Sequence, residues 1–475
     1  MSGRFGAGRD WGRVLVYGMG LSGTAAARLA RSRGAAVLGI DSREPAELDL
    51  GPLAGDPEVE LWAESSGAAE RGELPADVEA VVLSPGVPPG RPLLAAARRR
   101  GLPVVAEIEL AFPLLDGPVV AITGSNGKST TTALTGAMIR AAGREVEVCG
   151  NIGTPLVSVV DGAPGRVFAV EVSSFQLEAV ETFRPRAAAL LNVSPDHLDR
   201  YDDLDDYAAA KERIFARQRP EDVAVLNADD PRVARLEPVS RRRWFARRGA
   251  VADGCRLEGG RVVEVEPGDE RPVELFARAD VPLAGAHNLE NAMAAALLAR
   301  ALGAAPGDLR RGLAGFRGLP HRMERVAEAG GVVWYDDSKA TNVAATEKSI
   351  ADLPDGSVHL ILGGKPKGDD PADIAGLLRA KAKRVYLIGQ AADAFARSLD
   401  GVAPLERSGT LDRAVESAAA AAAPGDVVLL SPACASYDQF DDFAHRGRTF
   451  QRLVQEHAPR GGAARPGAAA TGEAG

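Results

Sequence analysis

The chain has 475 residues, a length that predicts about three globular domains at roughly 150 residues each. Of these residues, 45% are hydrophobic and 25% are charged. The formal net charge of −9 predicts no basic surface for a nucleic-acid partner. Its three cysteines are far apart and form no CxxC pair, which excludes a disulfide framework and a structural zinc site. The N-terminus has no apolar signal region and no run reaches about 18 apolar residues, so we expect a cytoplasmic protein without membrane contact.

The first part of the chain has the pattern of a nucleotide-binding βα unit. Residues 1–10 are rich in Gly and Arg, and we expect them to be frayed. A buried strand, Val14–Tyr17, is followed by a glycine turn, Gly18–Gly23, a helical stretch, and a second strand, Ala36–Ile40, that ends in Asp41. This order is typical of a Rossmann-like domain. The turn suits NAD(P) or the diphosphate of a nucleotide sugar, and it is also compatible with a tight turn that binds nothing.

Two further features precede the central part of the chain. The strand Ala80–Leu83 ends in a rigid turn, Ser84–Pro89, and ligands of open parallel sheets gather at such strand tips. Pro113–Pro118 then marks a plausible domain boundary.

The clearest motif is a strand, a glycine-rich loop and a helix at Val119–Thr132. Backbone N–H groups of such a loop, the positive end of the helix and a lysine can together hold phosphate, while a hydroxyl can hold Mg²⁺. The general phosphate-loop pattern has a glycine where this chain has Ile122, and a plain turn is the alternative reading. The residues expected to bind ATP phosphates are Gly124, Ser125, Asn126, Gly127, Lys128, Ser129 and Thr130.

Polar groups follow the next two predicted strands, Val167–Val170 and Ala187–Leu191. Because parallel strands end at one edge of a sheet, these groups are expected beside the phosphate loop, which predicts a metal and substrate site. Helix capping or local turn bonding is the alternative for Glu171 and His197. The groups are Glu171, Ser173, Gln176, Asn192, Asp196, His197 and Asp199.

The remainder of the central part offers fewer signals. In the helical stretch Tyr207–Phe215, spacing alone predicts that Lys211 is solvated. Residues 235–280 read as an irregular β-rich segment whose charge runs are solvated loops. Asn288 and Asn291 lie at i and i+3 on a long Ala/Leu helix, where their amides can bond a base or each other.

Gly312–Arg322 is the second predicted boundary, and a third α/β unit follows it. Its strands alternate with helical stretches, which favours a parallel sheet. The expected strands are Val332–Tyr335, Val358–Leu362, Val385–Ile388 and Val427–Leu430. Lys339, Thr341, Lys367 and Ser436 lie near their tips and suit a dicarboxylate ligand. From about Arg460 the chain is Gly, Ala and Pro without pattern, so we expect a disordered tail.

Together these motifs resemble those of the Mur ligases. Thr123–Thr130 (TGSNGKST) is similar to the short phosphate loop of that family, which explains the glycine missing at Ile122. Three stretches resemble the members that add D-glutamate: Glu171–Glu178 (EVSSFQLE), Asp337–Asn342 (DSKATN) and Ser431–Phe440 (SPACASYDQF). The resemblance covers about residues 12 to 457. Tyr437, where many relatives have an aliphatic residue, and the segment 235–280 depart from it.

The resemblance implies an α/β fold of three domains: a Rossmann-like N-terminal domain, a central P-loop NTPase-like domain with a parallel sheet, and a Rossmann-like C-terminal domain. Their expected limits are 1–114, 115–317 and 318–459, followed by the tail 460–475. The implied substrates are ATP, UDP-N-acetylmuramoyl-L-alanine and D-glutamate, joined through an acyl phosphate by a monomer whose domains close.

The resemblance also implies a role for each site residue. ATP would be bound by the phosphate loop with Asn288, Asn291, Arg322 and Asp337. Two Mg²⁺ ions would be held by Ser129, Glu171, His197 and a carbamate on Lys211. This role overturns the prediction that Lys211 is solvated. The catalytic residues would be Lys128, Glu171, His197 and Lys211. The UDP end of the substrate would lie near Leu21, Ser22, Asp41, Ser42, Arg43, Ser84 and Gly86. Asn151 and Gln176 would lie along the muramoyl group. D-glutamate would meet Lys339, Thr341, Lys367, Ser436, Tyr437 and Phe443.

The residues alone are also compatible with two other classes of protein. A non-catalytic nucleotide-binding protein could keep the ligase fold, and loss of Glu171, His197 or Lys211 would favour it; all three are present. A nicotinamide oxidoreductase rests only on Gly18–Gly23 with Asp41.

Overall fold

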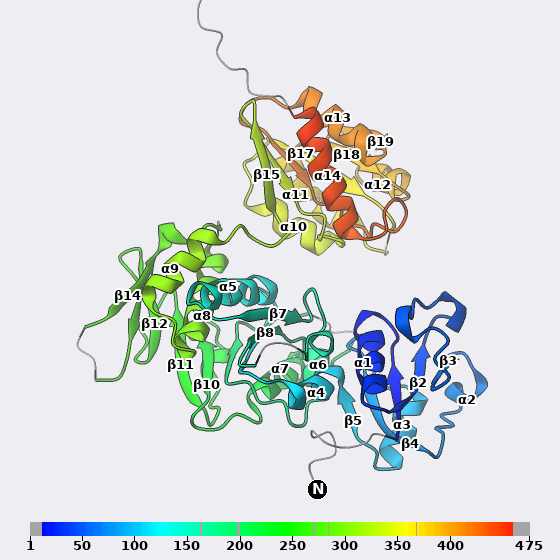
Figure 1. Ribbon diagram of the computed structural model, residues 1–475. Helices are drawn as coiled ribbons and strands as arrows, with labels where there is room; N and C mark the ends of the chain where they lie inside the picture. The colour runs from blue at the N-terminus through cyan, green and yellow to red at the C-terminus, as the bar shows by residue number, and fades with distance from the viewer. Residues whose placement is uncertain are drawn as a thin grey trace, which may run out of the picture. The chain divides into compact units, whose positions relative to one another are not determined.

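The computed structural model describes residues 12–161, 164–196, 200–268, 271–283, 285–366 and 368–458 (Figure 1). The chain divides into two compact units between Phe316 and Arg317, and each unit is described by itself. The expected frayed start, the expected tail and three candidate site residues, His197, Asp199 and Lys367, lie outside the described residues. Among the residues that are described, no helix is both long and apolar enough to span a membrane.

The predicted α/β fold class is confirmed, and the first of three sheets is entirely parallel, in the order β3-β2-β1-β4-β5. Its strands are β1 Arg13–Tyr17, β2 Ala36–Asp41, β3 Val59–Ala63, β4 Val78–Leu83 and β5 Val104–Ala106, and the helices are α1 Leu21–Ser32, α2 Gly67–Glu70, α3 Pro92–Arg99 and α4 Glu107–Ala111. The strand order reverses between β1 and β4, so the loops after these two strands lie where open parallel sheets bind ligands.

The second sheet belongs to the same unit and has nine strands in the order β14-β13-β12-β11-β10-β9-β6-β8-β7. The strands are β6 Val119–Thr123, β7 Val146–Gly150, β8 Val167–Glu171, β9 Ala187–Leu190, β10 Val223–Asn227, β11 Arg241–Ala246, β12 Gly254–Glu258, β13 Arg261–Val265 and β14 Val273–Ala277. The helices are α5 Lys128–Ala141, α6 Ser174–Leu177, α7 Leu204–Glu212, α8 Ala286–Ala301 and α9 Pro306–Gly315. β12, β13 and β14 pair antiparallel, and the other pairs are parallel.

Strand β6 occupies the position that organises the second sheet. All five of its residues are buried, as expected for a parallel strand with both faces covered. It pairs with β8 on one side, where Ile122 is opposite Glu171, and with β9 on the other, where Thr123 is opposite Leu190. The register therefore places the polar residues that follow β8 and β9 on either side of the loop that follows β6.

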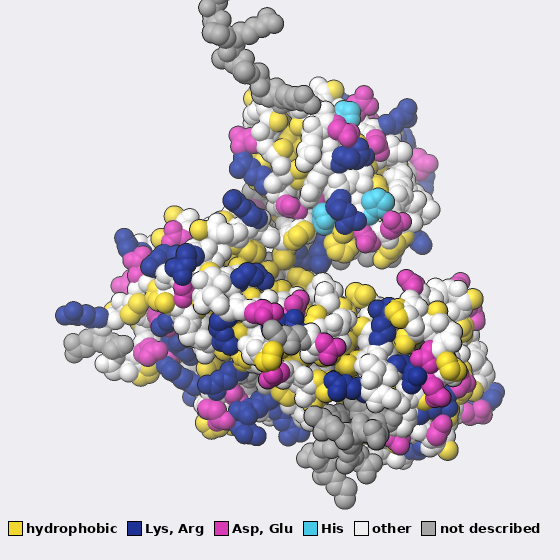
Figure 2. All heavy atoms as spheres, viewed as in Figure 1, with side chains coloured by type: hydrophobic (Ala, Val, Ile, Leu, Met, Phe, Trp, Pro, Cys, Tyr) yellow, Lys and Arg dark blue, Asp and Glu magenta, His cyan; other side chains and the backbone are white. Residues whose placement is uncertain are grey.

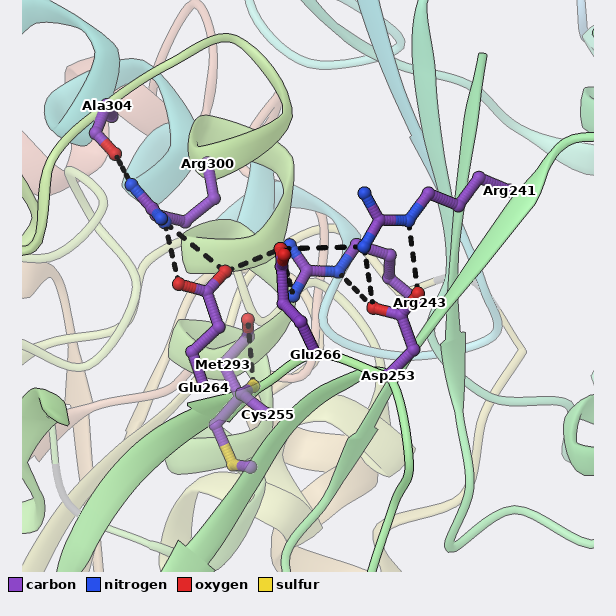
Figure 3. A network of polar contacts seen from close by, with 9 residues as sticks. All are labelled: Arg241, Arg243, Asp253, Cys255, Glu264, Glu266, Met293, Arg300 and Ala304. Carbon is purple, nitrogen blue, oxygen red and sulfur yellow. Dashed lines mark hydrogen bonds and ion pairs between the residues drawn. The ribbon is translucent and has the colours of Figure 1, made fainter. Parts of the chain in front are cut away.

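An ion-pair network joins the antiparallel edge of this sheet to helix α8 (Figure 3). The buried Glu264 of β13 accepts a hydrogen bond from Arg243 Nη1 at 2.9 Å and one from Arg300 Nε at 2.9 Å. Arg243 Nε also donates to Asp253 at 2.9 Å. The expectation that the charge run at 241–243 is solvated is therefore wrong for Arg243, which is buried because two carboxylates surround it.

Helix α4 connects the first and second sheets, and one of its carboxylates anchors it. Glu109 is buried and accepts hydrogen bonds from the backbone N–H groups of Glu181, Thr182 and Phe183 at 2.7–2.9 Å. A carboxylate that accepts several backbone donors is strongly held in the folded state. One apolar cluster also runs through both sheets and includes Val82 and Phe168. The two sheets are therefore joined by both polar and apolar contacts.

The third sheet forms the second unit, in the order β15-β16-β20-β17-β18-β19, with only the β15–β16 pair antiparallel. The strands are β15 Glu324–Ala329, β16 Val332–Asp336, β17 Val358–Gly363, β18 Ala382–Ile388, β19 Leu405–Gly409 and β20 Val427–Leu430. The helices are α10 Val343–Ala351, α11 Ala375–Lys381, α12 Ala392–Ser398, α13 Leu411–Ala421 and α14 Phe443–His457. The four predicted parallel strands are present within this sheet.

Acidic and basic side chains are interspersed on the face shown in Figure 2. Over the described residues on that face, Lys and Arg side chains alternate with Asp and Glu side chains in both units. On this face the described residues form no continuous basic track of the sort that holds a phosphate backbone.

Candidate functional site

The phosphate loop has the backbone conformation that its glycines predict. Gly124 and Gly127 have φ angles of 152° and 85°, and α5 begins at Lys128 directly after Gly127. A Cβ at position 127 would overlap the side-chain oxygen of Asn291. Position 127 therefore requires glycine for two reasons, the left-handed backbone and the close approach of Asn291.

The start of α5 is arranged to receive an anion. Its N-cap is Gly127, and in this described segment no side chain caps the helix and no acidic residue lies in its first turn. The first N–H groups of a helix lack partners within the helix and carry its positive dipole end. Ser129 and Thr130 lie in this turn and are buried. The turn therefore offers backbone N–H groups and hydroxyls to a phosphate.

The opposite side of the loop is held by residues that follow β9. Asn192 Oδ1 accepts from the Asn126 N–H at 2.8 Å, and Asn192 Nδ2 donates to the Asn126 carbonyl at 3.1 Å. The Ser194 N–H donates to Ser125 Oγ at 3.0 Å. These contacts make the loop rigid, and they give Asn192 a positioning role.

Two lysines converge on one carbonyl oxygen of the loop. Lys128 Nζ donates to Gly124 O at 2.9 Å, and Lys211 Nζ donates to the same atom at 3.0 Å, so the two nitrogens are at most about 6 Å apart. Lys211 is 1% exposed. Burial, with the nearby charge of Lys128, lowers the pKa of Lys211 to about 7 although Asp196 acts in the opposite direction. The solvated reading of Lys211 from helical spacing is therefore wrong.

Glu171 supplies a buried carboxylate beside this loop. Its Oε1 accepts from Asn151 Nδ2 at 2.8 Å. Its Oε2 is buried and has no hydrogen-bond partner among the described residues. A buried carboxylate oxygen without a donor is costly unless a cation fills the place. Oxygen atoms of Glu171 and Ser129 are the donors that Mg²⁺ prefers, so the residues present fit a magnesium ion.

Two family models match the middle and C-terminal parts of the chain, and curated relatives match almost its whole length. The Mur ligase middle domain matches residues 122–299, and the Mur ligase, glutamate ligase domain matches residues 321–434. The UDP-N-acetylmuramoylalanine–D-glutamate ligase of Acidobacterium capsulatum is 45% identical over 457 residues, covering 95% of this chain and 97% of the relative. That of Anaeromyxobacter dehalogenans is 48% identical over 460 residues, covering 94% and 98%. The chain belongs to the Mur ligase family.

Solved Mur ligases share the fold of this one. UDP-N-acetylmuramate–alanine ligase from Thermotoga maritima has a TM-score of 0.54 at 19% identity, with 94% of this chain and 99% of that chain covered. The MurF ligase of the same organism, solved with ADP, has a TM-score of 0.52 at 18% identity, with 94% and 96% covered.

The glycine turn of this Mur ligase is closed by Asp41 at the tip of β2. Asp41 Oδ2 accepts from the Met19 N–H at 2.7 Å, and Oδ1 accepts from Arg43 Nε at 2.9 Å. Burial alone would raise the pKa of Asp41, but the Arg43 guanidinium and two backbone donors outweigh it and lower that pKa. Asp41 therefore fixes the shape of the glycine turn through its bonds with Met19 and Arg43.

The other candidate residues of the nucleotide end surround this turn. Leu21 is 73% exposed at the start of α1, as an apolar platform for a flat base would be. Ser84 Oγ donates to the Gly18 carbonyl at 2.6 Å and ties the tip of β4 to the turn. Ser22, Ser42 and Gly86 lie at the same edge of the sheet, because they follow the carboxyl ends of the parallel strands β1, β2 and β4.

Gln176 is engaged inside the protein. It is 1% exposed, its Oε1 accepts from the Ser173 N–H at 2.8 Å, and its Nε2 donates to Glu107 Oε1 at 2.7 Å. Burial raises the pKa of Glu107 to about 7 although the Gln176 hydrogen bond lowers it. The amide of Gln176 therefore locks α6 against α4, and its predicted contact with the muramoyl group stays a prediction.

In the second unit, Asp337 follows β16 and bonds the segment that contains Arg322, because its Oδ1 accepts from the Met323 N–H at 3.2 Å. Asp337 is buried and accepts from Ser431 Oγ at 2.8 Å, and burial raises its pKa to about 6 against the hydrogen bonds it accepts. His321 and Met323, on either side of Arg322, have φ angles of 61° and 44°. Non-glycine residues with positive φ cluster at functional sites because the surrounding structure must hold them there.

The predicted D-glutamate residues fall into two groups by exposure. Ser436 is buried, whereas the next residue, Tyr437, is 68% exposed. The ammonium of Lys339 lies 5.3 Å from the centre of the Phe443 ring. Thr341 is partly buried at the loop before α10. The roles assigned to these residues stay predictions, and Lys367 lies outside the described residues.

Sequence reasoning missed Arg446, which is fully buried and the most deeply buried arginine among the described residues of this unit. Its guanidinium donates to Ser338 Oγ at 2.9 Å and to the carbonyls of Ser338 and Cys434 at 2.9 and 3.1 Å, which joins the two C-terminal signature loops. A signal was available, because Arg446 stands at the helical spacing of the buried Phe450 and Leu453. An arginine on the apolar face of a helix indicates a buried polar partner.

We expect Gly127→Ala to weaken binding of a non-hydrolysable ATP analogue at least about tenfold, because strain of about 1–3 kcal/mol and displacement of Asn291 act together. Isothermal titration in the presence of Mg²⁺ measures it. Gly143→Ala is the matched control, since Gly143 has a φ of 79° but open space around it. Equal analogue affinity in Gly127→Ala and the wild type would contradict the role of the loop.

Proposed function

We propose that this Mur ligase joins D-glutamate to UDP-N-acetylmuramoyl-L-alanine with hydrolysis of ATP, a step of peptidoglycan precursor synthesis. The observation that carries this proposal is the identity of 45% and 48% to two ligases of that name over nearly the full length of both chains. The signature stretches at Glu171–Glu178 and Ser431–Phe440 support the same amino-acid substrate.

The reaction follows from the groups that the substrates bring. The carboxylate of the alanyl group attacks the γ-phosphorus of ATP, which gives an acyl phosphate and ADP. The amine of D-glutamate then attacks the acyl carbon, the amide forms, and inorganic phosphate leaves. In such a reaction the protein contributes positioning and charge neutralisation. Lys128 and the N-terminus of α5 neutralise the phosphates, and Asn288 and Asn291 sit beside the loop, 3.2 Å apart through their amides.

Magnesium would be held by Ser129 and Glu171, with His197 and a modified Lys211 as further ligands. When bound, Mg²⁺ supplies positive charge that neutralises the phosphate oxygens. The buried Oε2 of Glu171, which accepts no hydrogen bond from the described residues, supports this assignment. Asn151 positions the other carboxylate oxygen of Glu171 by donating to it.

We propose that Lys211 carries a carbamate. Its neutral amine attacks carbon dioxide, a C–N bond forms, and one proton is released to solvent. The product is a carboxylate, which turns a cation into an oxygen ligand. A pKa of about 7 leaves about half of the amine neutral at pH 7, whereas an ordinary lysine is almost entirely charged there. The fully buried position of Lys211 beside Lys128 gives the negative charge an immediate partner.

The remaining assignments are proposals from the resemblance. The UDP end meets Leu21, Ser22, Asp41, Ser42, Arg43, Ser84 and Gly86, and D-glutamate meets Lys339, Thr341, Lys367, Ser436, Tyr437 and Phe443. We further propose that the domains run 1–114, 115–317 and 318–459, and that the enzyme acts as a cytoplasmic monomer.

We expect ADP release to require both UDP-N-acetylmuramoyl-L-alanine and D-glutamate, measured in a coupled assay with a panel of amino acids. Omission of either substrate should reduce steady-state release to background, because the acyl phosphate accumulates on the enzyme or does not form. Turnover with another amino acid at the rate seen with D-glutamate would reject the amino-acid assignment. Binding of NADH, followed by fluorescence, would favour the oxidoreductase reading.

We expect Lys211→Ala to abolish activity and small carboxylates such as formate to restore part of it, since they replace the lost carbamate oxygens. Lys128→Ala is the matched control, because Lys128 bonds the same Gly124 carbonyl but contributes charge to phosphate. That variant should be inactive with and without formate. Full activity of Lys211→Ala, or equal rescue of both variants, would contradict the carbamate role.

A further inference from the structure

Arg200 bonds both sheets of the first unit through one guanidinium. Its Nη1 donates to the Val87 carbonyl at 2.9 Å, in the loop that follows β4 of the first sheet. Its Nε and Nη2 donate to the two carboxylate oxygens of Glu178 at 2.9 and 2.7 Å, just after α6 of the second sheet. The fork of an arginine satisfies a carboxylate in two bonds and leaves donors for a third partner, which an ammonium cannot do.

The surroundings of Arg200 fix its plane. The guanidinium carbon lies 4.3 Å from the centre of the Phe175 ring, and Phe175 belongs to α6. Tyr201 OH donates to Glu178 Oε1 at 2.6 Å, so that carboxylate is held from two directions. The side chains of Arg200 and Glu178 are 13% and 25% exposed, so water competes little for these contacts.

On the first sheet, the contacts continue to the glycine turn. The Val87 N–H donates to the Ser84 carbonyl at 3.1 Å, and Ser84 Oγ donates to the Gly18 carbonyl at 2.6 Å. Both Ser84 and the turn are among the residues proposed to hold the UDP end of the substrate. The position of Val87 is therefore tied to the shape of that binding loop.

On the second sheet, the contacts continue to the phosphate loop. The Phe175 and Tyr201 rings stack with centroids 6.2 Å apart, and the Tyr201 and Tyr207 centroids are 5.1 Å apart. Tyr207 OH lies 3.4 Å from Ser125 Oγ, and Lys211 Nζ lies 4.2 Å from the centre of the Tyr207 ring. Every step from the Gly18 turn to the phosphate loop is thus a direct contact.

We propose that Arg200 is a positioning residue that couples the nucleotide-sugar loop, Ser84–Val87, to the phosphate loop, so that binding of the UDP substrate strengthens binding of ATP. The proposal rests on the proposed function, because that function places one substrate at each end of the contact series. Arg200 touches neither reacting group; it acts through Glu178 and Phe175 on one side and through the Val87 carbonyl on the other.

The test measures the dissociation constant of a non-hydrolysable ATP analogue with Mg²⁺, by isothermal titration, with and without UDP-N-acetylmuramoyl-L-alanine. In the wild type we expect the UDP substrate to tighten analogue binding by about tenfold. In Arg200→Ala this ratio should fall to within about twofold of one, while the analogue alone binds as in the wild type. Arg200→Lys should lose the coupling as well, because an ammonium keeps the charge but cannot make the guanidinium contacts with both Glu178 and Val87. If Arg200→Ala does not fold, the ratio in Arg200→Lys tests the proposal.

Arg184→Ala is the matched control, because Arg184 makes a similar two-bond pair with Asp222 at 2.7 and 3.2 Å without a partner from the first sheet among the contacts described. It should keep the wild-type ratio. A wild-type ratio near one, or an unchanged ratio in both Arg200 variants, would overturn the proposal while ADP release by the wild type still supports the proposed function. Absence of that ADP release would instead reject the proposed function itself.

Discussion

The site is organised around two lysine side chains, Lys128 and Lys211, whose nitrogens both donate to the carbonyl oxygen of Gly124. Like charges this close, one of them buried, repel each other, and the pKa of Lys211 falls to about 7 as a result of burial and of Lys128. The proposed function adds the negative charge of the ATP phosphates to this site. The glycine backbone, the Asn192 amide and the uncapped start of α5 all hold the loop open for that anion.

The same constraint relates the two sheets of the first unit. A ligase must bring a phosphate donor and a carboxylate together, so the strand tips of the two sheets must keep a fixed position relative to each other. Two separate sets of contacts do this: Glu109 with the backbone of 181–183, and Arg200 with Val87 and Glu178. The buried Glu107–Gln176 pair adds a third set of contacts, between α4 and α6.

Much of the fold could be predicted because parallel strands are continuous apolar runs that end in polar loops, as in β6 with its phosphate loop and β8 with Glu171. The sheet order and the burial of Lys211 could not. Helical spacing cannot reveal that other elements bury a lysine, and only the family resemblance predicted a function for Lys211. Arg243, Arg200 and Arg446 were missed for the same reason, since their partners come from distant segments. Arg446 alone left a local signal, an arginine on an apolar helix face.

Carbon-13 nuclear magnetic resonance of the protein with labelled carbon dioxide is the most direct test of the proposed carbamate on Lys211, because it would observe that group itself. At constant dissolved carbon dioxide and with Mg²⁺ present, we expect one carbamate signal per chain that grows as the pH rises through about 7, where the buried amine loses its proton. The signal should be absent from Lys211→Met. No signal in the wild type at pH 8, or the same signal in the variant, would contradict a carbamate on Lys211.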